Sequence, residues 1–500
     1  MKPELRTLLL TPDAMAAVDA AAAASGIDSF GLMVKAGEVV AATALRLYPG
    51  AVRFVVLCGP GNNGGDGYVA ARALAACGAT VAIHHLGDPA RLTGDAQKAY
   101  RRCGVIGHPL EAYQPLAGDV VIDAVFGAGL ARDVPAAMAD LVERIAAAGL
   151  PVIAVDLPSG LDGRTGLVRC AAVRATHTVT FMSRKPGHLL LPGRDLCGTV
   201  EVYDIGIPAR LVAAHAGAMS VNHPSIWGRS IPQATSDSHK YRRGHLTVFS
   251  GGSAATGAAR LSAMSGLRVG AGLVTLASPQ EAMAANAAQT TAVMVKPVDD
   301  LSALQAYLQD GRRGAFVLGP GFGVGAHARD FALALKDRLL VLDADGLTAF
   351  KEDPQSLFAA FAGGDARLVL TPHEGEFARL FADLAADASL GKVDRALAAA
   401  ARAHAVVVYK GADTVIAAPD GRALINDNAP PWLATAGSGD VLAGMIGGLL
   451  AQGVPAFEAA AAGVWLHGEA GQRAGEGLTA EDLAAVVKPF SALVHLPGRT

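Results

Sequence analysis

Cysteine is scarce in this 500-residue sequence, and neither sign of charge is in large excess. The five cysteines, an odd number, are scattered through the first half without the spacing of a metal site, which indicates only a reducing compartment. The formal net charge of −3 gives no electrostatic reason to expect nucleic acid or a membrane surface as a partner. We therefore expect neither.

Long hydrophobic runs are also missing. The longest, residues 441–457, is broken by Gln452 and Pro455 and is better explained as a buried helix than as a membrane span. Residues 1–12 lack the apolar core of a signal peptide, so we expect a cytoplasmic protein. The chain is too long for one core, and abundant alanine with 59 glycines favours helices joined by tight turns. Two or three domains are expected.

The first half contains a glycine-rich turn after a predicted strand at 53–58. Gly59, Gly61 and Gly64 match the dinucleotide-binding fingerprint in its strand–turn–helix context. The next predicted strand ends in His84-His85, where such a fold places the acid that binds a ribose. The missing acid argues against an ordinary NAD(H)-dependent dehydrogenase.

Two further predicted strands of this half end in carboxylates, at Asp123 and Asp156. Alternating strands and helices imply a parallel sheet, whose carboxyl ends share one crevice. Asn63, Asp123 and Ser159 can meet there as an all-oxygen set suited to a hard cation rather than to zinc. Asp156 can act on a substrate proton. The alternative for each aspartate alone is a loop cap, and Arg184-Lys185 is either phosphate-facing or solvated.

Several long motifs of residues 10–210 resemble the YjeF N-terminal domain, a Rossmann-like three-layer α/β fold. They are Asn62–Asp66, Val121–Leu130, Asp156–Gly163, Thr178–Phe181, Lys185–Gly187 and Asp204–Pro208. Members of that family are NAD(P)HX epimerases, which interconvert the R and S forms of hydrated nicotinamide cofactor. The resemblance implies that the cofactor is the substrate here, which accounts for the missing ribose acid.

The resemblance also assigns residues in this half. Asp156 would be catalytic, and K⁺ would be held by Asn63, Asp123 and Ser159. The hydrate would contact Asn62, Asn63, Gly64, Gly65, Asp66, Gly127, Ala128, Gly129, Leu130, Ala131, Arg132, Asp133 and Asp156.

The regular alternation of strands and helices stops near residue 209 and returns near residue 244. Histidine, serine, proline and asparagine replace it in between, which is typical of a linker. We therefore predict a first domain at 1–215, a linker at 216–234 and a second domain at 235–500.

The second half contains the turn Gly437-Ser-Gly-Asp440 before a long predicted helix, 441–450. Glycines before a helix let backbone amides point at an anion, and the helix dipole adds to the attraction. The Asp440 carboxylate would weaken phosphate binding, but it suits a base that takes a proton from a hydroxyl attacking a phosphoryl group. The alternative is a capping aspartate on a tightly packed helix.

Small or polar loops follow the other predicted strands of this half, at 251–258, 319–325, 343–346, 371–376 and 410–414. Each has a plainer explanation. His373 can be an ordinary helix-start residue, Lys410-Gly411 a solvated hairpin turn, and Asp343 and Asp345 turn and cap residues.

The order of these loops resembles the YjeF C-terminal domain, a ribokinase-like three-layer α/β fold, over residues 235–495. That family dehydrates (S)-NAD(P)HX with ADP or ATP, and the sequence does not decide between the two nucleotides. Asp440 would be catalytic, and the hydrate would contact Ala258, Gly323, His373 and Asp440. The nucleotide, with Mg²⁺ on its phosphates, would be held by Lys410, Gly411, Ala412, Asp413, Thr414 and Gly439.

The two resemblances together imply a bifunctional enzyme that repairs hydrated nicotinamide cofactors, and we expect a homo-oligomer. Phosphorylating the ring hydroxyl would make it a good leaving group, and loss of phosphate would restore NAD(P)H. Two alternatives stay open. One is a kinase for a vitamin or a sugar alcohol, and the other is a first half that binds a ligand without catalysis.

Overall fold

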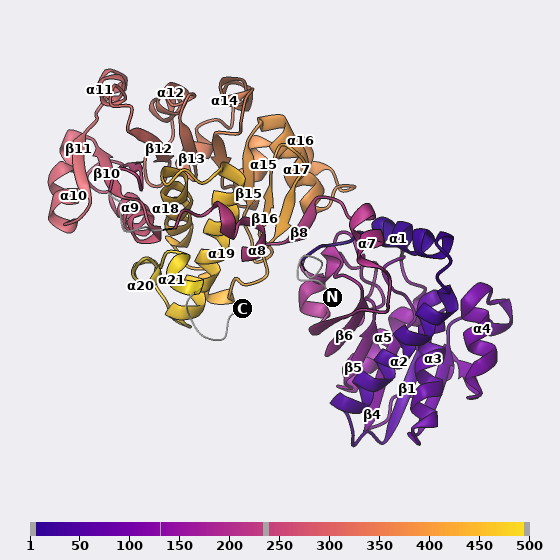
Figure 1. The fold of residues 1–500 in the computed structure, drawn as a ribbon. Helices are drawn as coiled ribbons and strands as arrows, with labels where there is room; N and C mark the ends of the chain where they lie inside the picture. Colours follow the sequence, from indigo (N-terminus) through magenta and orange to yellow (C-terminus); the bar gives the residue numbers. More distant parts are fainter. Residues whose placement is uncertain (1–6, 131, 234–239, 495–500) are drawn as a thin grey trace. The chain divides into compact units, whose positions relative to one another are not determined.

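The computed structural model describes residues 7–130, 132–233 and 240–494. The chain divides between Ser220 and Val221 into two compact units, each with its own sheet (Figure 1). None of the helices in the described ranges has the length and apolar character needed to cross a bilayer.

The first unit is built on a seven-stranded sheet in the order β3-β2-β1-β4-β5-β6-β7, and every pair of neighbours is parallel. Its strands are β1 (Arg53–Cys58), β2 (Val81–His85), β3 (Gly107–Pro109), β4 (Asp119–Ala124), β5 (Val152–Val155), β6 (His177–Phe181) and β7 (Thr199–Tyr203). Its helices are α1 (Pro12–Ala24), α2 (Ser29–Leu47), α3 (Asn62–Ala76), α4 (Gly94–Cys103), α5 (Ala136–Ala147), α6 (Gly193–Leu196) and α7 (Ala209–His215).

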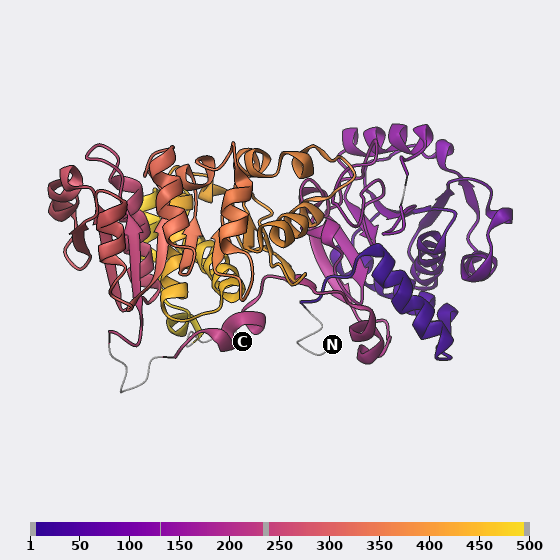
Figure 2. The ribbon, with the colours of Figure 1, turned by 90° about the horizontal axis from the view of Figure 1, so that it is seen from above.

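Strand β1 shows why this unit has three layers. Side chains alternate along a strand, so Phe54 and Val56 enter the core formed with α1 to α4, whereas Val55 and Leu57 enter the core formed with α5. Helices therefore cover both faces of the sheet, as Figure 2 shows from above. The carboxyl ends of β1, β4 and β5 are left open along one edge.

The second unit is built on a ten-stranded sheet in the order β11-β10-β9-β12-β13-β14-β15-β16-β17-β8. Its strands are β8 (Met219–Val221), β9 (His245–Phe249), β10 (Leu273–Ser278), β11 (Met294–Pro297), β12 (Arg313–Leu318), β13 (Leu339–Leu342), β14 (Leu368–Leu370), β15 (Val406–Tyr409), β16 (Val415–Ala417) and β17 (Ala423–Ile425). The neighbours from β11 to β15 are parallel, and the pairs β15–β16 and β16–β17 are antiparallel.

Helices again cover both faces of this sheet. They are α8 (Pro224–Trp227), α9 (Gly257–Val269), α10 (Met283–Gln289), α11 (Leu301–Tyr307), α12 (Ala326–Ala334), α13 (Asp345–Thr348), α14 (Pro354–Phe361), α15 (Glu374–Leu380), α16 (Ala382–Ala386), α17 (Lys392–Ala403), α18 (Ser438–Ala451), α19 (Ala456–Ala474), α20 (Ala480–Val486) and α21 (Ser491–Val494). Leu246 and Val248 of β9 pack in the core with α9, α18 and α19, while Phe249 packs against Phe331 of α12. Both units have the three-layer α/β architecture that the sequence predicted.

Helix α18 is apolar on all sides because it is buried on all sides. Its backbone packs directly against the backbone of α9, with no side chain between them. A Cβ at Gly444 would lie 2.0 Å from the carbonyl oxygen of Ser262, and one at Gly448 would lie 2.6 Å from that of Gly266. The hydroxyls of Ser262 and Ser265 donate to carbonyls of α18, at 2.7 and 2.8 Å.

The segment predicted as a linker, 216–234, contains more structure than its composition indicated. It carries β8, which joins the edge of the second sheet, and Trp227, which is fully buried in the second core. The indole of Trp227 donates to the side-chain oxygen of Asn222 at 3.0 Å. Composition did not reveal this, because one strand of three residues and one tryptophan hardly alter it.

Candidate active sites

The carboxyl edge of the first sheet holds a cavity of about 660 Å³. Of the residues predicted to bind substrate, those lining it are Asn62, Asn63, Asp66, Gly127, Ala128, Gly129, Leu130, Arg132 and Asp156. Gly64 and Gly65 do not line the cavity; they lie where α3 packs closely against neighbouring segments. A Cβ at Gly64 would lie 2.0 Å from the Gly59 carbonyl oxygen. Asp133 is exposed and does not line the cavity, and Ala131 lies outside the described residues.

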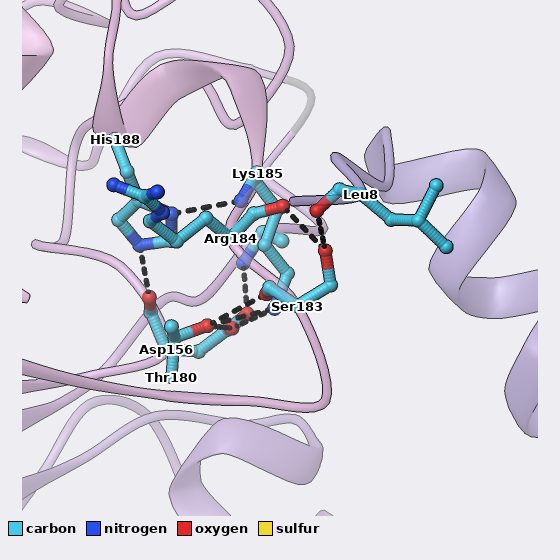
Figure 3. Close-up of polar contacts among 8 residues, drawn as sticks. Leu8, Asp156, Thr180, Ser183, Arg184, Lys185 and His188 are labelled. Atoms are coloured by element: carbon cyan, nitrogen blue, oxygen red, sulfur yellow. Dashed lines mark hydrogen bonds and ion pairs between the residues drawn. The ribbon is translucent and has the colours of Figure 1, made fainter. Parts of the chain in front are cut away.

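Asp156 lies in this cavity as half of a buried ion pair (Figure 3). Its Oδ1 is 2.5 Å from Nζ of Lys185 and accepts from the Thr180 hydroxyl at 2.9 Å. Its Oδ2 accepts from the backbone N–H of Ala128, also at 2.9 Å. The φ angle of Asp156 is 65°, which is rare for a residue with a Cβ and is typical of strained functional sites.

Lys185 is held in place from two directions. Its side chain is only 2% exposed and also donates to Thr180 at 2.9 Å. The neighbouring Arg184 carbonyl accepts from the N–H of Leu10 at 3.2 Å, so the segment before α1 fixes this loop. Of the two sequence-based alternatives, the solvated side chain does not describe Lys185, which is buried and pairs with Asp156.

His188 connects the backbones of the two charged residues. Its Nδ1 accepts from the Lys185 N–H at 2.9 Å, so Nε2 carries the proton that is donated to the Asp156 carbonyl at 2.8 Å. Burial and the positive charge of Lys185 together lower the pKa of His188 to about 4. The neutral ring therefore fixes both residues.

The ion pair sets the protonation state of Asp156. Burial by itself would raise the pKa of this carboxyl, but the charge and hydrogen bond of Lys185 and the N–H of Ala128 outweigh it and lower the pKa to about 2. Asp156 is therefore an ionised, well-satisfied group and a weak base.

The three residues predicted to hold a hard cation lie together beside this pair. Ser159 donates from its hydroxyl to Asp123 Oδ1 at 2.6 Å and from its N–H to Oδ2 at 2.7 Å. A Cβ at Gly127 would lie 3.0 Å from Asn63 Oδ1 and 3.1 Å from Asp156 Oδ2, so glycine leaves room between them. The Nδ2 atom of Asn63 is buried without a partner among the described residues. The oxygens of this set fit a hard cation better than zinc.

In the second unit, Asp440 lies in the first turn of α18. Gly437 begins this helix with φ 84°, a conformation that a glycine adopts without strain. The buried His467 contacts Ser438 at its hydroxyl, 3.1 Å, and its carbonyl, 3.0 Å. Gly437 precedes the helix and has no side chain to cap it, and the Asp440 carboxylate accepts no hydrogen bond from the described residues. The alternative role as a cap is therefore not observed.

Lys410 lies between two carboxylates near that helix. Its Nζ lies 2.8 Å from Asp343 Oδ1 and 3.9 Å from Glu376 Oε2. A Cβ at Gly439 would lie 3.4 Å from the same nitrogen, which places the lysine beside the first turn of α18. The predicted residues Lys410, Gly439 and Asp440 thus meet in one site.

The charges of this site shift two pKa values. Burial and, to a smaller extent, repulsion from Asp343 and Asp345 raise the pKa of Asp440 to about 6 against the opposing charge of Lys410. Burial would lower the pKa of Lys410, but attraction to Asp343 and Glu376 raises it. Lys410 stays charged, while Asp440 titrates close to neutrality, as a general base does.

The other predicted contacts lie on the loops around Asp440. Gly323 donates from its N–H to Asp345 Oδ2 at 2.9 Å, and Ala258 would lie 3.5 Å from a Cβ on the neighbouring Gly321. His373 is exposed and begins α15, where its Nδ1 accepts from the Gly375 N–H at 3.0 Å. It is therefore a helix-start residue. Its Nε2 also lies 3.4 Å from Oε1 of Glu376, which places it next to the site.

The segment 410–414 joins the antiparallel strands β15 and β16. Lys410-Gly411 therefore does lie in a hairpin turn, as one sequence-based alternative stated. It is not merely a solvated turn, because Asp413 and Thr414 are buried. Thr414 closes the turn by donating to the Gly411 carbonyl at 2.7 Å, and Ala412 is exposed beside it. Lys392 of α17 pairs with Asp413 and lies 5.0 Å from the Tyr409 ring centroid.

Asp19, Lys392 and His467 are residues of these sites that were not identified from the sequence, whereas Glu376 lies in the motif at 371–376. Each of the three comes from a helix that carries no motif. Only packing brings it to a loop that does.

Comparison with known proteins covers both units. A sequence profile described as NAD(P)H-hydrate dehydratase matches residues 246–488, and one described as YjeF-related protein N-terminus matches residues 29–187. The chain is 38% identical to the bifunctional NAD(P)H-hydrate repair enzyme Nnr of Moorella thermoacetica, over 90% of this chain and 88% of the relative. It is 36% identical to that of Thermofilum pendens, over 91% and 89%. A ribokinase-like superfamily protein of Enterococcus faecalis superposes with a TM-score of 0.48 and 25% identity, over 54% of this chain and 94% of that protein.

Proposed function

This chain belongs to the family of bifunctional NAD(P)H-hydrate repair enzymes, and we propose that it performs both reactions of that repair. The first unit, about residues 1–215, epimerises R- and S-NAD(P)HX. The second, about residues 235–500, dehydrates the S form to NAD(P)H with ADP or ATP, giving AMP or ADP and phosphate. The observation that carries the proposal is that relatives named for this activity match nine-tenths of the chain, a length that spans most of both units.

In the second unit, Asp440 is proposed as the base. It would take the proton of the ring hydroxyl while that oxygen attacks the terminal phosphoryl group, and the amides at the start of α18 would stabilise the transferred charge. Lys410 would face the same phosphates. The phosphorylated oxygen would then leave as phosphate, and the ring double bond would form again. Hydrate contacts are proposed at Ala258, Gly323 and His373, and nucleotide contacts at residues 410–414 and Gly439.

Magnesium is proposed as the companion of the nucleotide. The carboxylates of Asp343 and Glu376 contact Lys410, and those of Asp343 and Asp345 lie close enough to Asp440 to raise its pKa. Phosphates entering this site would meet net negative charge, which a divalent cation would neutralise.

In the first unit, the hydrate is proposed to enter the 660 Å³ cavity, with K⁺ held by Asn63, Asp123 and Ser159. The cation would supply fixed positive charge beside the Asp156–Lys185 pair. By family membership we also propose a cytoplasmic homo-oligomer whose partners are the hydrates and the adenine nucleotide.

The direct test uses a mixture of R- and S-NADHX with magnesium, potassium and ADP or ATP. We expect complete recovery of NADH, followed by its near-ultraviolet absorbance and corrected for spontaneous epimerisation. The Asp156→Ala variant should stop at the S fraction. No recovery with either nucleotide would refute the dehydratase assignment, and a stable phosphorylated product would favour the kinase alternative.

Potassium dependence gives a second prediction. In dialysed protein, the epimerisation rate should rise with KCl and not with choline chloride at equal ionic strength. Ser159→Ala should raise the KCl concentration for half-maximal rate about tenfold or more, because it removes one oxygen and loosens Asp123. KCl should also raise the unfolding temperature of the wild-type first unit, and Ser159→Ala should lose that rise. Equal rates in the two salts would contradict the cation site.

A further inference from the structure

Helix α1 forms one wall of the first-unit cavity, although it lies outside the matched profile at 29–187. Pro12, Met15, Ala16, Asp19 and Ala23 line the cavity from this helix. Its start is fixed by Thr11, whose side chain accepts from the Ala14 N–H, and by the N–H of Leu10, which donates to Arg184 beside Lys185. The wall is therefore tied to the loop that carries the ion pair.

Six charged side chains line this cavity, namely Asp19, Asp66, Asp95, Arg132, Asp156 and Lys185. Asp156 and Lys185 hold one another, and Asp95 accepts hydrogen bonds from Ser29 and Lys98. The carboxyls of Asp19 and Asp66, in contrast, accept no hydrogen bond from any residue that the structure describes. Two unsatisfied carboxyl groups facing one cavity are free to bond to a ligand.

The two groups differ from Asp156 in protonation. Asp19 is exposed to water through the open cavity, yet the surrounding protein raises its pKa to about 6, with Lys185 opposing and Asp156 adding to the rise. Burial raises the pKa of Asp66 well above its ordinary value, and Asp156 and Asp19 raise it further. Arg210 and His215 of α7, which packs against α1, are exposed.

We propose that Asp19 is a catalytic residue of the first unit and transfers a proton to or from the hydroxyl-bearing carbon's oxygen, with Asp66 as the second carboxyl group of the exchange. This inference rests on the proposed epimerase function. It assigns the ionised Asp156–Lys185 pair to binding and electrostatic stabilisation. Pairs of acids in unlike environments are the usual way for a site to hold one proton donor and one acceptor.

The chemistry balances. Water adds to an enamine with its proton on the β carbon and its hydroxyl on the carbon bonded to nitrogen, and that carbon can be inverted by breaking its C–O bond and forming it again on the other face. The neutral carboxyl group, Asp66, gives its proton to the hydroxyl oxygen, the nitrogen lone pair forms a C=N bond, and water leaves. Water then adds to the opposite face, and the ionised carboxylate, Asp19, takes its proton. One proton is given and one is taken, with no oxidant or reductant.

Asp19→Asn tests this assignment, because asparagine keeps the shape of the side chain and cannot carry the proton. With purified R-NADHX, conversion to the S form should slow about 100-fold. The wild-type rate should rise with pH through about 6, as Asp19 ionises, and the variant should lose that rise. Asp19→Glu should regain part of the rate. Nucleotide-dependent dehydration of pure S-NADHX should not change.

The matched control is Asp140→Asn, on the exposed face of α5 and outside the cavity, which should epimerise at the wild-type rate. An Asp19→Asn protein within about threefold of wild type, with its pH profile intact, would overturn the role of Asp19 alone. Wild-type protein that does not interconvert the two forms would overturn the epimerase function as well. The two failures are therefore distinguishable.

Discussion

Replacing Asp440 by asparagine should lower the rate of nucleotide-dependent dehydration about a thousandfold, because asparagine cannot accept the hydroxyl proton. The substitution preserves size and removes repulsion from Asp343 and Asp345, so the second unit should not lose stability. The wild-type rate should rise with pH through about 6 as Asp440 ionises, and the variant should lack that rise. Recovery of NADH from pure S-NADHX at several pH values measures both effects.

An aspartate that only caps a helix provides the control. Asp300 caps α11 by accepting from the Ala303 N–H at 2.8 Å, and Asp300→Asn keeps a good capping residue. If Asp440 only favoured its helix, the two variants would behave alike. Asp440→Asn protein with a tenth or more of wild-type activity would contradict the role of Asp440 as a base.

Replacing Lys185 by methionine should have the largest effect in the first unit. It leaves the Asp156 carboxylate with Thr180 and the Ala128 N–H as its partners, and breaking a buried ion pair in this way costs about 3–5 kcal/mol. Epimerisation should fall at least about 100-fold, because the charge that orients Asp156 is gone. The loss of stability should shrink as the pH falls, first because burial without Lys185 raises the pKa of Asp156 in the variant, and finally near pH 2, where Asp156 of the wild type is protonated as well.

The chain allows the two units to be followed separately. All three tryptophans, Trp227, Trp432 and Trp465, belong to the second unit, so their fluorescence reports its unfolding alone. Hydrogen exchange of β5 and β6 would report the first unit. Arg46→Met, which breaks an exposed pair with Glu201, should cost no more than about 1 kcal/mol. An equally small cost for Lys185→Met would contradict a structural ion pair.

The meeting of Asn63, Asp123, Asp156 and Ser159 was predictable because it follows from topology. Polar residues directly after parallel strands reach the same edge of a sheet, whatever the details of packing. Lys410 directly follows the parallel strand β15 in the same way, whereas Asp440 reaches it from the first turn of α18. Whether Gly64 and Gly65 face a ligand or a neighbouring segment was not predictable, since both explanations require glycine.

The environment of Lys185 depends on contacts between distant segments. Residues 8–10 pack on its loop, and His188 folds back to Asp156, so a side chain that a local pattern leaves undecided becomes fully buried. Asp19 gave no signal either, because a lone acid in an alanine-rich helix is ordinarily solvated. β8 was missed for a similar reason, since its partner strand β17 is two hundred residues away in the sequence.

The contact between α9 and α18 limits how this enzyme can be altered. Where two backbones touch, neither helix has room to shift or rotate, and any side chain added at Gly444 would displace the turn that carries Asp440. The position of Asp440, the proposed base, is therefore fixed within the unit. Redesign toward other hydrates or other phosphoryl donors must work through the loops at 319–325 and 410–414, which can change length and composition while the helix pair keeps its alignment.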